Sequence, residues 1–206
     1  MSFLSQLHWR YATKKFDAKR KLSKNDLSAV LEAIRMAPTS FGLESYKVVV
    51  ISDQETKNAL REASFGQESV STASHVIVFC ARTDLFRVKN EKFERLSGGD
   101  PEKRRALSKF ESVVRLVLIL KNLTFRAASW SAKQTYIHLA FAMAACAELG
   151  IDSCPIEGFR PGKYSKILRL PGNLVPTLVL PVGYRSPDDV QRPKSRSPMN
   201  EILIRK

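Results

Sequence analysis

Residues 129–149 are the part of the sequence that most constrains the fold, because this helix-length segment is apolar on almost every face. A helix that is hydrophobic all round has to be buried against other elements. Its longest apolar run, Leu139–Cys146, is far shorter than the roughly 18 residues that would span a bilayer. We therefore expect a helix at the centre of the molecule or in a subunit interface, ending at Gly150.

Three shorter apolar runs predict buried strands at residues 46–52, 75–81 and 175–183. The first two are continuously apolar, which is typical of a sheet covered on both faces. Between the strands, start signals and apolar periodicity predict further helices. These are residues 2–9, a helix capped by Ser23 and ended by Pro38, one capped by Asp53 and running to about Ser64, one from Asp100 to about Asn122, and a short one at 163–169.

The length of 206 residues favours one α/β or α+β domain over two domains. The net charge of +14 favours an anionic partner, namely a phosphorylated cofactor, nucleic acid or an anionic membrane surface. The densest basic clusters, at 19–21 and 103–105, are most simply solvated surface. The absence of a secretory signal and the three unpaired cysteines, Cys80, Cys146 and Cys154, favour a cytoplasmic protein.

No metal site is expected, since no cysteine or histidine stands at metal-ligand spacing. The glycine-rich loops that usually hold dinucleotides and nucleoside triphosphates are also missing. A bound nucleotide would therefore need side chains to hold its phosphate. Lys194 and Arg196 stand two apart in the basic tail, and residues at that spacing face the same way in extended chain, so both could converge on one anion. A merely solvated tail is the alternative.

Six short segments in order along the chain resemble the nitroreductase family of FMN-dependent NAD(P)H oxidoreductases. They are Arg10–Asp17 (RYATKKFD), Ala37–Ser40 (APTS), Ala73–Phe79 (ASHVIVF), Ala132–Tyr136 (AKQTY), Pro155–Phe159 (PIEGF), and Pro181–Gly183 with Pro193–Arg196 (PVG and PKSR). The resemblance implies that residues 1–206 form a single α+β domain with a nitroreductase-like fold. It also implies a central mixed sheet flanked by helices and an entwined homodimer with FMN sites at the subunit interface.

The same resemblance assigns roles to residues. Arg10, Lys194 and Arg196 would hold the FMN phosphate, and Lys14 would favour negative charge at the flavin N1/O2 edge. Glu157 and Gly158 would place backbone N–H groups near the flavin N5, so these two and Lys14 are the catalytic candidates. The whole predicted cofactor set is Arg10, Tyr11, Ala12, Lys14, Pro38, Thr39, Ser40, Gly42, Gln67, Pro155, Ile156, Glu157, Gly158, Lys194 and Arg196.

Within that set, the Pro38–Gly42 loop would reach the flavin of the other subunit, and Gln67 would hydrogen-bond to the pyrimidine edge. Phe41, which is outside the set, would contact the substrate. Hydride would pass from NAD(P)H through FMN to a nitroaromatic, quinone or similar small acceptor. Two departures from the family pattern bear on this interpretation. Ala12 replaces a small hydroxyl residue, and residues 41–46 (FGLESY) replace a loop that carries Asn and Gln-Pro-Trp.

These departures keep open a flavoprotein of the same fold with another reaction, such as flavin storage, flavin destruction or dehalogenation. A nucleic-acid-binding protein is the alternative from another class, suggested by the charge alone. The sequence carries no helix-turn-helix signature, zinc ligands or RNA-binding aromatic strands to support it.

Overall fold

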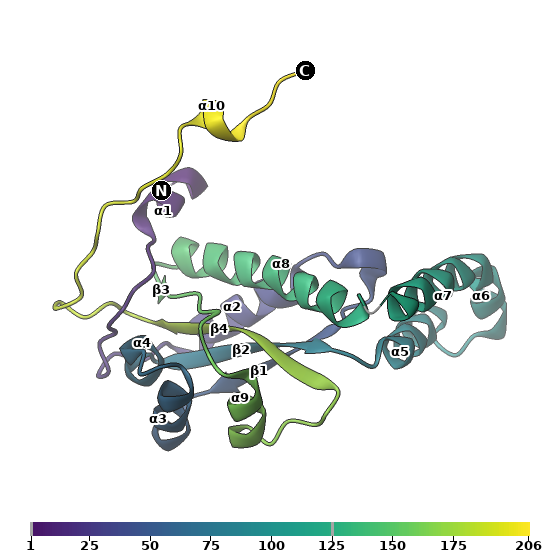
Figure 1. The fold of residues 1–206 in the computed structure, drawn as a ribbon, viewed down its shortest axis with the longest axis horizontal. Coiled ribbons are helices and arrows are strands. Elements are labelled where there is room, and N and C mark those ends of the chain that lie inside the picture. The colour runs from purple at the N-terminus through teal and green to yellow at the C-terminus, as the bar shows by residue number, and fades with distance from the viewer. Residues whose placement is uncertain (1, 125) are drawn as a thin grey trace.

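A computed structural model describes residues 2–124 and 126–206. A sheet lies between two layers of helices, and three helices extend from one end of it (Figure 1). The strands are β1 (Tyr46–Ile51), β2 (His75–Arg82), β3 (Asp152–Ser153) and β4 (Leu174–Gly183). The helices are α1 (Phe3–Trp9), α2 (Lys24–Met36), the 3-10 turn η1 (Ser40–Gly42), α3 (Gln54–Ala63), α4 (Glu68–Thr72), α5 (Leu85–Ser97), α6 (Pro101–Ala106), α7 (Ser108–Leu123), α8 (Ala127–Glu148), α9 (Pro161–Ile167) and α10 (Met199–Ile202).

The sheet has the strand order β1-β2-β4-β3, and each neighbouring pair of these strands is antiparallel. The α+β class is confirmed. The expected mixed sheet needs parallel pairing, and among the described residues this is limited to one isolated bridge between Ala12 and Ser153. That bridge fixes the segment after α1 beside β3, which is the edge of the sheet where the candidate site lies.

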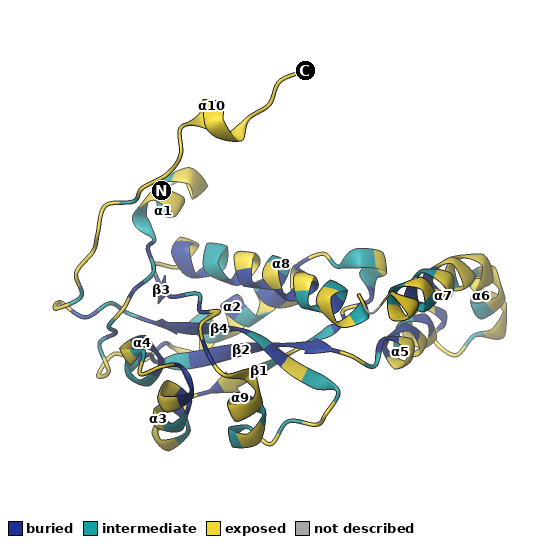
Figure 2. Cartoon of the chain, in the orientation of Figure 1, coloured by how far each residue is buried: buried dark blue, intermediate teal, exposed yellow. Residues whose placement is uncertain are grey.

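The strand β2 runs through the centre of the core, and its alternating side chains enter two separate clusters. Val76, Val78 and Cys80 pack with residues of α3, α4 and α9 on one face. Ile77 and Phe79 pack with residues of α2 and α8 on the other face. All five are fully buried, as the dark ribbon of β2 shows (Figure 2). A sheet covered on both faces was the expectation from its continuous apolar runs, and it is confirmed.

Helix α8 is the predicted apolar helix, and it lies across the sheet beside α2 (Figure 1). Leu139, Ala142 and Cys146 face the sheet and are buried. On the opposite side, Tyr136 and Phe141 stay 45% and 41% exposed. One face of α8 therefore packs in the core. The other face carries apolar side chains that the single chain leaves exposed.

The predicted helix starts are confirmed by their caps. The side chains of Ser23, Asp53 and Asp100 accept hydrogen bonds from the first-turn N–H groups of α2, α3 and α6. The helix expected from Asp100 to about Asn122 is wrong in one respect, because it is two helices. Leu107 separates them, with φ −80° and ψ −7°. Its side chain packs against a hydrophobic cluster formed mainly by residues of α5 and α7.

The helical extension has its own small core, formed by α5, α6 and α7 at the end of the sheet (Figure 1). Leu85, Val88 and Phe93 of α5 pack against Val114 and Leu118 of α7. A helix at residues 85–97 was not predicted, although these apolar positions carry a helical spacing. None of the helices described is long and apolar enough to cross a membrane.

Gly183, the last residue of β4, lies so close to neighbouring atoms that a side chain there should disturb the packing. A Cβ there would lie 3.0 Å from Phe16 Cδ1 and 3.1 Å from the Ser74 backbone nitrogen. Because the backbone nitrogen cannot turn aside, we expect Gly183→Ala to lower the free energy of unfolding by about 1–3 kcal/mol. Urea denaturation measures this, with Gly172→Ala as the control, since no heavy atom lies within 4 Å of a Cβ at Gly172. Equal midpoints for the two variants would contradict the packing argument.

Candidate functional site

The two ends of the chain meet at a cavity of about 820 Å³, a volume within the range of small-molecule sites. One wall is the segment after α1, and the opposite wall is the tail after β4 (Figure 1). The lining residues are Arg10, Tyr11, Ala12, Lys14, Lys15, Glu68, Pro155, Asp188, Asp189, Val190, Arg192, Pro193, Lys194, Ser195 and Arg196. Seven of the predicted cofactor residues are among them: Arg10, Tyr11, Ala12, Lys14, Pro155, Lys194 and Arg196.

The N-terminal wall is extended chain held by the sheet. Besides the bridge of Ala12 to Ser153, Phe16 forms an antiparallel bridge with Arg185. The side chains of Thr13 and Phe16 are buried between these contacts, whereas Lys14 is exposed. Ala12 and Lys14 line the cavity, while Thr13 and Phe16 are buried in the core.

Arg10, Lys194 and Arg196 lie close enough to affect one another's charge. The pKa of the Arg10 guanidinium is lowered by burial first and by the nearby Arg196 second. The pKa of Lys194 is likewise lowered by burial, and then by Arg10 and Arg196. The Arg10 Nε atom is buried and has no hydrogen-bond partner among the described residues. Mutual repulsion among these cations and an unsatisfied donor both favour the binding of a multiply charged anion.

Lys194 also ties the tail to the N-terminal helix. Its Nζ donates to the backbone carbonyls of Leu7, at 3.0 Å, and His8, at the end of α1. A lysine in this position satisfies carbonyls that a helix end leaves unpaired. Since an ammonium group has three N–H donors, one is left for a ligand. Arg196 donates from Nη1 to its neighbour's carbonyl, that of Ser195.

Lys14 extends toward the buried thiol of Cys154, with 3.7 Å between Nζ and Sγ. Burial raises the pKa of this thiol, and the nearby Lys14 opposes that rise. Burial dominates, so Cys154 is a neutral thiol that accepts a weak hydrogen bond rather than an ion-pair partner. Lys14 also lines the cavity.

Pro155 lines the cavity, whereas the other predicted cofactor residues in and beside the Pro155–Phe159 loop, Ile156, Glu157, Gly158 and Gln67, do not. Ile156 pairs with Val179 of β4 through both backbone groups, which fixes the start of the loop. Gln67 fixes its far end, donating from Nε2 to the carbonyls of Gly158, at 2.8 Å, and Ser64, at 3.1 Å. In the part of the chain that the structure describes, the N–H groups of Glu157 and Gly158 donate to no backbone carbonyl.

Glu157 is exposed, and its carboxylate faces Tyr136 of α8. The nearby carboxylate of Glu157 and, after it, burial raise the pKa of the Tyr136 hydroxyl. Gln67, by contrast, differs from the expected geometry, because its amide nitrogen is already engaged by the two carbonyls. Only its amide oxygen remains for another partner.

Beneath the N-terminal wall, Asp152 and Arg185 form a supporting ion pair. Asp152 Oδ1 accepts from Arg185 Nε at 2.8 Å, and Oδ2 accepts from the Arg185 backbone N–H at 2.8 Å. The guanidinium of Arg185 lies over the rings of Trp9 and Tyr11, at 4.5 and 4.7 Å from their centroids. The pair therefore holds the aromatic residues on either side of Arg10.

The structure does not bring the Pro38–Gly42 loop to this cavity within one chain. None of Pro38, Thr39, Ser40, Phe41 and Gly42 lines it. The Ser40 N–H donates instead to Gln134 Oε1 on α8, at 2.9 Å. Phe41 has φ 56° and is 37% exposed, with its ring centroid 6.4 Å from that of Phe110 on α7. The expected contact of this loop with the flavin of another subunit stays a prediction.

Eight residues of the cavity wall are outside the predicted cofactor set, and five of them are charged: Lys15, Glu68, Asp188, Asp189 and Arg192. Lys15 and Arg192 belong to basic segments whose charge density was visible. The three acids gave no signal, because an isolated acid in a basic segment has the pattern of ordinary surface charge. A cluster of three or more metal-ligating side chains is not found among the residues described.

A smaller cavity of about 260 Å³ lies between α2, β1 and α5. Its charged side chains largely neutralise one another. Arg82 pairs with Glu91 at 2.6 Å, and Arg95 pairs with Glu44 at 2.8 Å. With its charges paired, this cavity is the weaker candidate for an anionic ligand, and the larger one is the candidate functional site.

The chain resembles known proteins over most of its length. The sequence profile of the nitroreductase family matches residues 7–184, a range that includes the N-terminal wall, the sheet and the Pro155–Phe159 loop. The chain belongs to the nitroreductase family. This is a family of oxidoreductases. A Bacillus subtilis (strain 168) relative named "Putative NAD(P)H nitroreductase YfkO" is 35% identical over 212 residues, covering 97% of this chain and 95% of the relative.

Solved structures of other proteins show the nitroreductase fold of this chain. A nitroreductase-like protein from Streptococcus mutans has a TM-score of 0.88 at 20% identity, covering 99% of this chain and 98% of the other. A "putative nitroreductase in complex with FMN" from Exiguobacterium sibiricum 255-15 has a TM-score of 0.80 at 22% identity, covering 100% and 98%. At these identities the likeness concerns the fold alone.

Proposed function

We propose that this nitroreductase-family protein binds FMN in the cavity between its two termini and uses it to oxidise NAD(P)H and reduce a small acceptor. The observation that carries the proposal is the meeting of Arg10 with Lys194 and Arg196, residues from opposite ends of the chain, around one cavity. The FMN-bound fold neighbour and the name of the Bacillus relative support it.

The residues present fit a flavin phosphate. A dianionic phosphate needs several charge-assisted donors, and arginine provides a forked set of them. Arg10 has a buried Nε without a partner among the described residues, and Lys194 has one N–H left over. A bound phosphate would relieve the repulsion that lowers the pKa of both residues. The three cations together would hold the phosphate end of the cofactor.

When bound, FMN supplies the hydride transfer between a nicotinamide and an acceptor. The chain supplies orientation and charge. Lys14 would place a positive charge beside the ring edge on which negative charge accumulates during reduction, which favours reduction. The unpaired N–H groups of Glu157 and Gly158 would bind the ring near the atom that receives hydride. Gln67 holds that loop in place through the carbonyl of Gly158.

The acceptor is proposed to be a nitroaromatic, a quinone or a similar small molecule. The loop before β1 is where this chain departs from the family pattern, and the structure shows it in an unusual conformation. Phe41 and Glu44 both have positive φ values, 56° and 53°. Arg95 of α5 holds Glu44 at 2.8 Å. A loop fixed in this way would alter the acceptor pocket, so a flavoprotein of this fold with another reaction is the second candidate.

We also propose that the chain works as a homodimer. Large apolar side chains are exposed on α1, α7, α8 and the tail, including Leu4 (67%), Leu116 (57%), Leu123 (70%) and Ile204 (84%). Exposed apolar patches of this kind favour an interface. A second subunit could also bring its Pro38–Gly42 loop to the cavity. Sedimentation equilibrium tests the assembly: we expect twice the chain mass of 23.2 kDa, and a stable monomer would contradict it.

Two assays on the purified protein test the proposed function. The protein should be yellow or become so with added FMN, and it should oxidise NADH or NADPH when menadione or a nitrofuran is present. A colourless protein that takes up no FMN would overturn the proposal. FMN binding without oxidation of either nicotinamide would instead favour the second candidate.

Lys14→Ala separates tuning from binding. We expect this variant to slow the reduction of bound flavin by about tenfold to a hundredfold, while FMN affinity falls less, because the lost charge acts on the reduced ring. Stopped-flow reduction by NAD(P)H measures the rate. Lys15→Ala is the matched control, since Lys15 lines the same cavity but pairs with Asp188 at 3.6 Å. Equal reduction rates for Lys14→Ala and the wild type would refute the role.

A further inference from the structure

The wall of the cationic cavity contains two aspartates, although the proposed ligand is an anion. Asp188 and Asp189 line the cavity together with Arg10, Lys14 and Lys194. A carboxylate facing an anion weakens its binding by like-charge repulsion. Either these acids lower the affinity of the site, or their charge is used in another way.

The two acids differ sharply in their contacts. Asp189 Oδ1 accepts from the backbone N–H groups of Lys14, at 3.1 Å, and Lys15, at 2.9 Å. Its Oδ2 accepts from the Tyr11 hydroxyl at 2.5 Å. Both oxygens are thus engaged by the segment that carries Arg10 and Lys14. The side chain of Asp188 is 77% exposed, and its one contact of this kind within the described part of the chain is a 3.6 Å ion pair with Lys15.

Asp189 therefore joins the two walls of the cavity, because it lies in the tail and accepts hydrogen bonds from the N-terminal segment. The surrounding backbone supports the junction, with the Ser186 N–H donating to the Lys15 carbonyl and the Asp189 N–H donating to the Ser186 carbonyl, both at 3.0 Å. Five residues further on, Lys194 ties the tail to the end of α1. The tail from 189 to 194 is fastened to the N-terminal segment at both ends, and Arg196 follows directly.

We propose that Asp189 is a positioning residue that fixes Arg10 and Lys14 against Lys194 and Arg196, and so preorganises the anion site although it is itself an acid. The proposal rests on the proposed FMN function. Three charge-assisted hydrogen bonds to one carboxylate outweigh the distant repulsion of an anion, because the engaged carboxylate faces its donors at hydrogen-bond distance. Preorganised cations bind a phosphate without the cost of ordering both chain ends.

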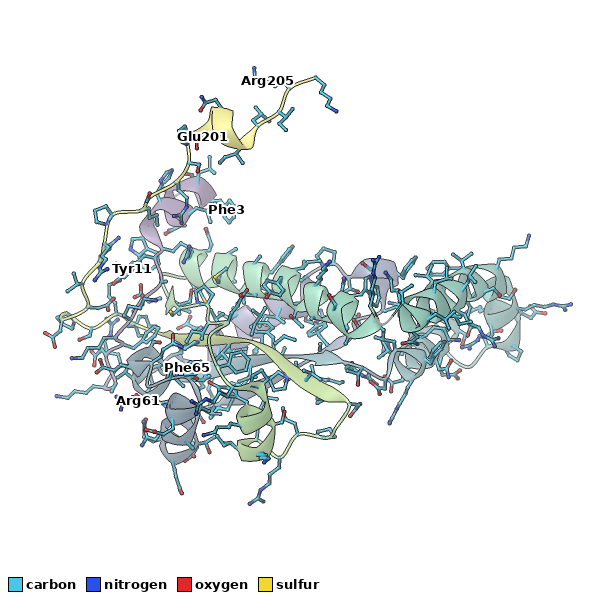
Figure 3. The ribbon with its side chains drawn as sticks, viewed as in Figure 1. Phe3, Tyr11, Arg61, Phe65, Glu201 and Arg205 are labelled. Atoms are coloured by element: carbon cyan, nitrogen blue, oxygen red, sulfur yellow. The ribbon has the colours of Figure 1, made fainter. Side chains whose placement is uncertain are left out.

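The pKa of the Tyr11 hydroxyl depends on this contact and can be measured without any ligand. Burial and the hydrogen bond to Asp189 raise the pKa of the Tyr11 hydroxyl to about 12. Figure 3 labels Tyr11 below α1, where the N-terminal segment enters the site. A loss of the carboxylate should bring this hydroxyl toward the ordinary tyrosine pKa, roughly 10.

Asp189→Asn and Asp188→Asn form a matched pair, since each removes one negative charge from the same wall. If charge alone mattered, both variants would bind FMN more tightly. The proposal predicts opposite signs: Asp188→Asn keeps or slightly strengthens FMN binding, and Asp189→Asn weakens it by about tenfold. Fluorescence titration of FMN measures both affinities. Unchanged or tighter binding by Asp189→Asn would overturn the proposal.

Two further measurements keep this test separate from the test of the proposed function. Amide hydrogen exchange at Lys14 and Lys15 should speed up in Asp189→Asn and not in Asp188→Asn. Alkaline titration at 295 nm should show one tyrosine shifted downward in Asp189→Asn alone. A wild-type protein that binds no FMN would contradict the function, and the exchange data would still decide whether Asp189 holds the segment. Wild-type exchange rates in Asp189→Asn would contradict the positioning role whatever the FMN result.

Discussion

Arg10→Ala is expected to weaken FMN binding by about tenfold to a hundredfold, because it removes a half-buried guanidinium from the proposed phosphate site. Charge-assisted hydrogen bonds contribute about 1.5–3 kcal/mol each. Burial is the first cause of the lowered pKa of Arg10, and its Nε lacks a partner among the described residues. Arg196 is more exposed, so we expect Arg196→Ala to have an effect in the lower part of this range.

Isothermal titration calorimetry with FMN measures the loss. Arg10→Lys should restore part of the affinity, because it returns the charge without the forked donors. Arg105→Ala, at an exposed position on α6, removes the same side chain elsewhere and should bind FMN like the wild type. Wild-type affinity in Arg10→Ala would place the phosphate somewhere else.

Asp152→Ala should have the largest effect on stability among the residues that support the site. Asp152 is 4% exposed and accepts from both the side chain and the backbone of Arg185. Removing one partner of a buried pair leaves the other charge and N–H donors unsatisfied. Since the Arg185 side chain is 28% exposed and can partly rehydrate, we expect a loss of about 2–3 kcal/mol in the free energy of unfolding.

Chemical denaturation followed by circular dichroism measures this loss. Asp188→Ala is the control, because it breaks an exposed ion pair of 3.6 Å, and such pairs contribute little. The FMN affinity of Asp152→Ala should fall as well, since Arg185 holds the rings of Trp9 and Tyr11. Stability equal to that of Asp188→Ala would show that the pair is not a structural support.

Much of the fold could be predicted from local patterns. Ser23 and Asp53 were identified as helix caps from their residue types, and the apolar runs at 46–52 and 75–81 correspond to β1 and β2. Elements without a local signature were missed. Strand β3 has two residues, too short for any periodicity, and the break at Leu107 depends on packing against α5 and α7.

The candidate site was predictable only where residues carry the family pattern. Arg10 and Lys194 are far apart in sequence, and no periodicity relates them, so only the resemblance placed them together. Asp189 could not be found in this way, because its role lies in contacts to the backbone of residues at the other end of the chain. The tail beyond it, which includes Glu201 and Arg205, extends away from the body of the chain (Figure 3).

Comparing FMN with riboflavin tests the central claim most directly, because the two differ only in the phosphate. If the cations of the two chain ends hold that phosphate, FMN should bind at least about a hundredfold more tightly than riboflavin at low salt, which is the lower bound for two charge-assisted contacts of about 1.5 kcal/mol each. The difference should shrink as salt screens the charges. Equal affinity for the two flavins at every salt concentration would contradict the account.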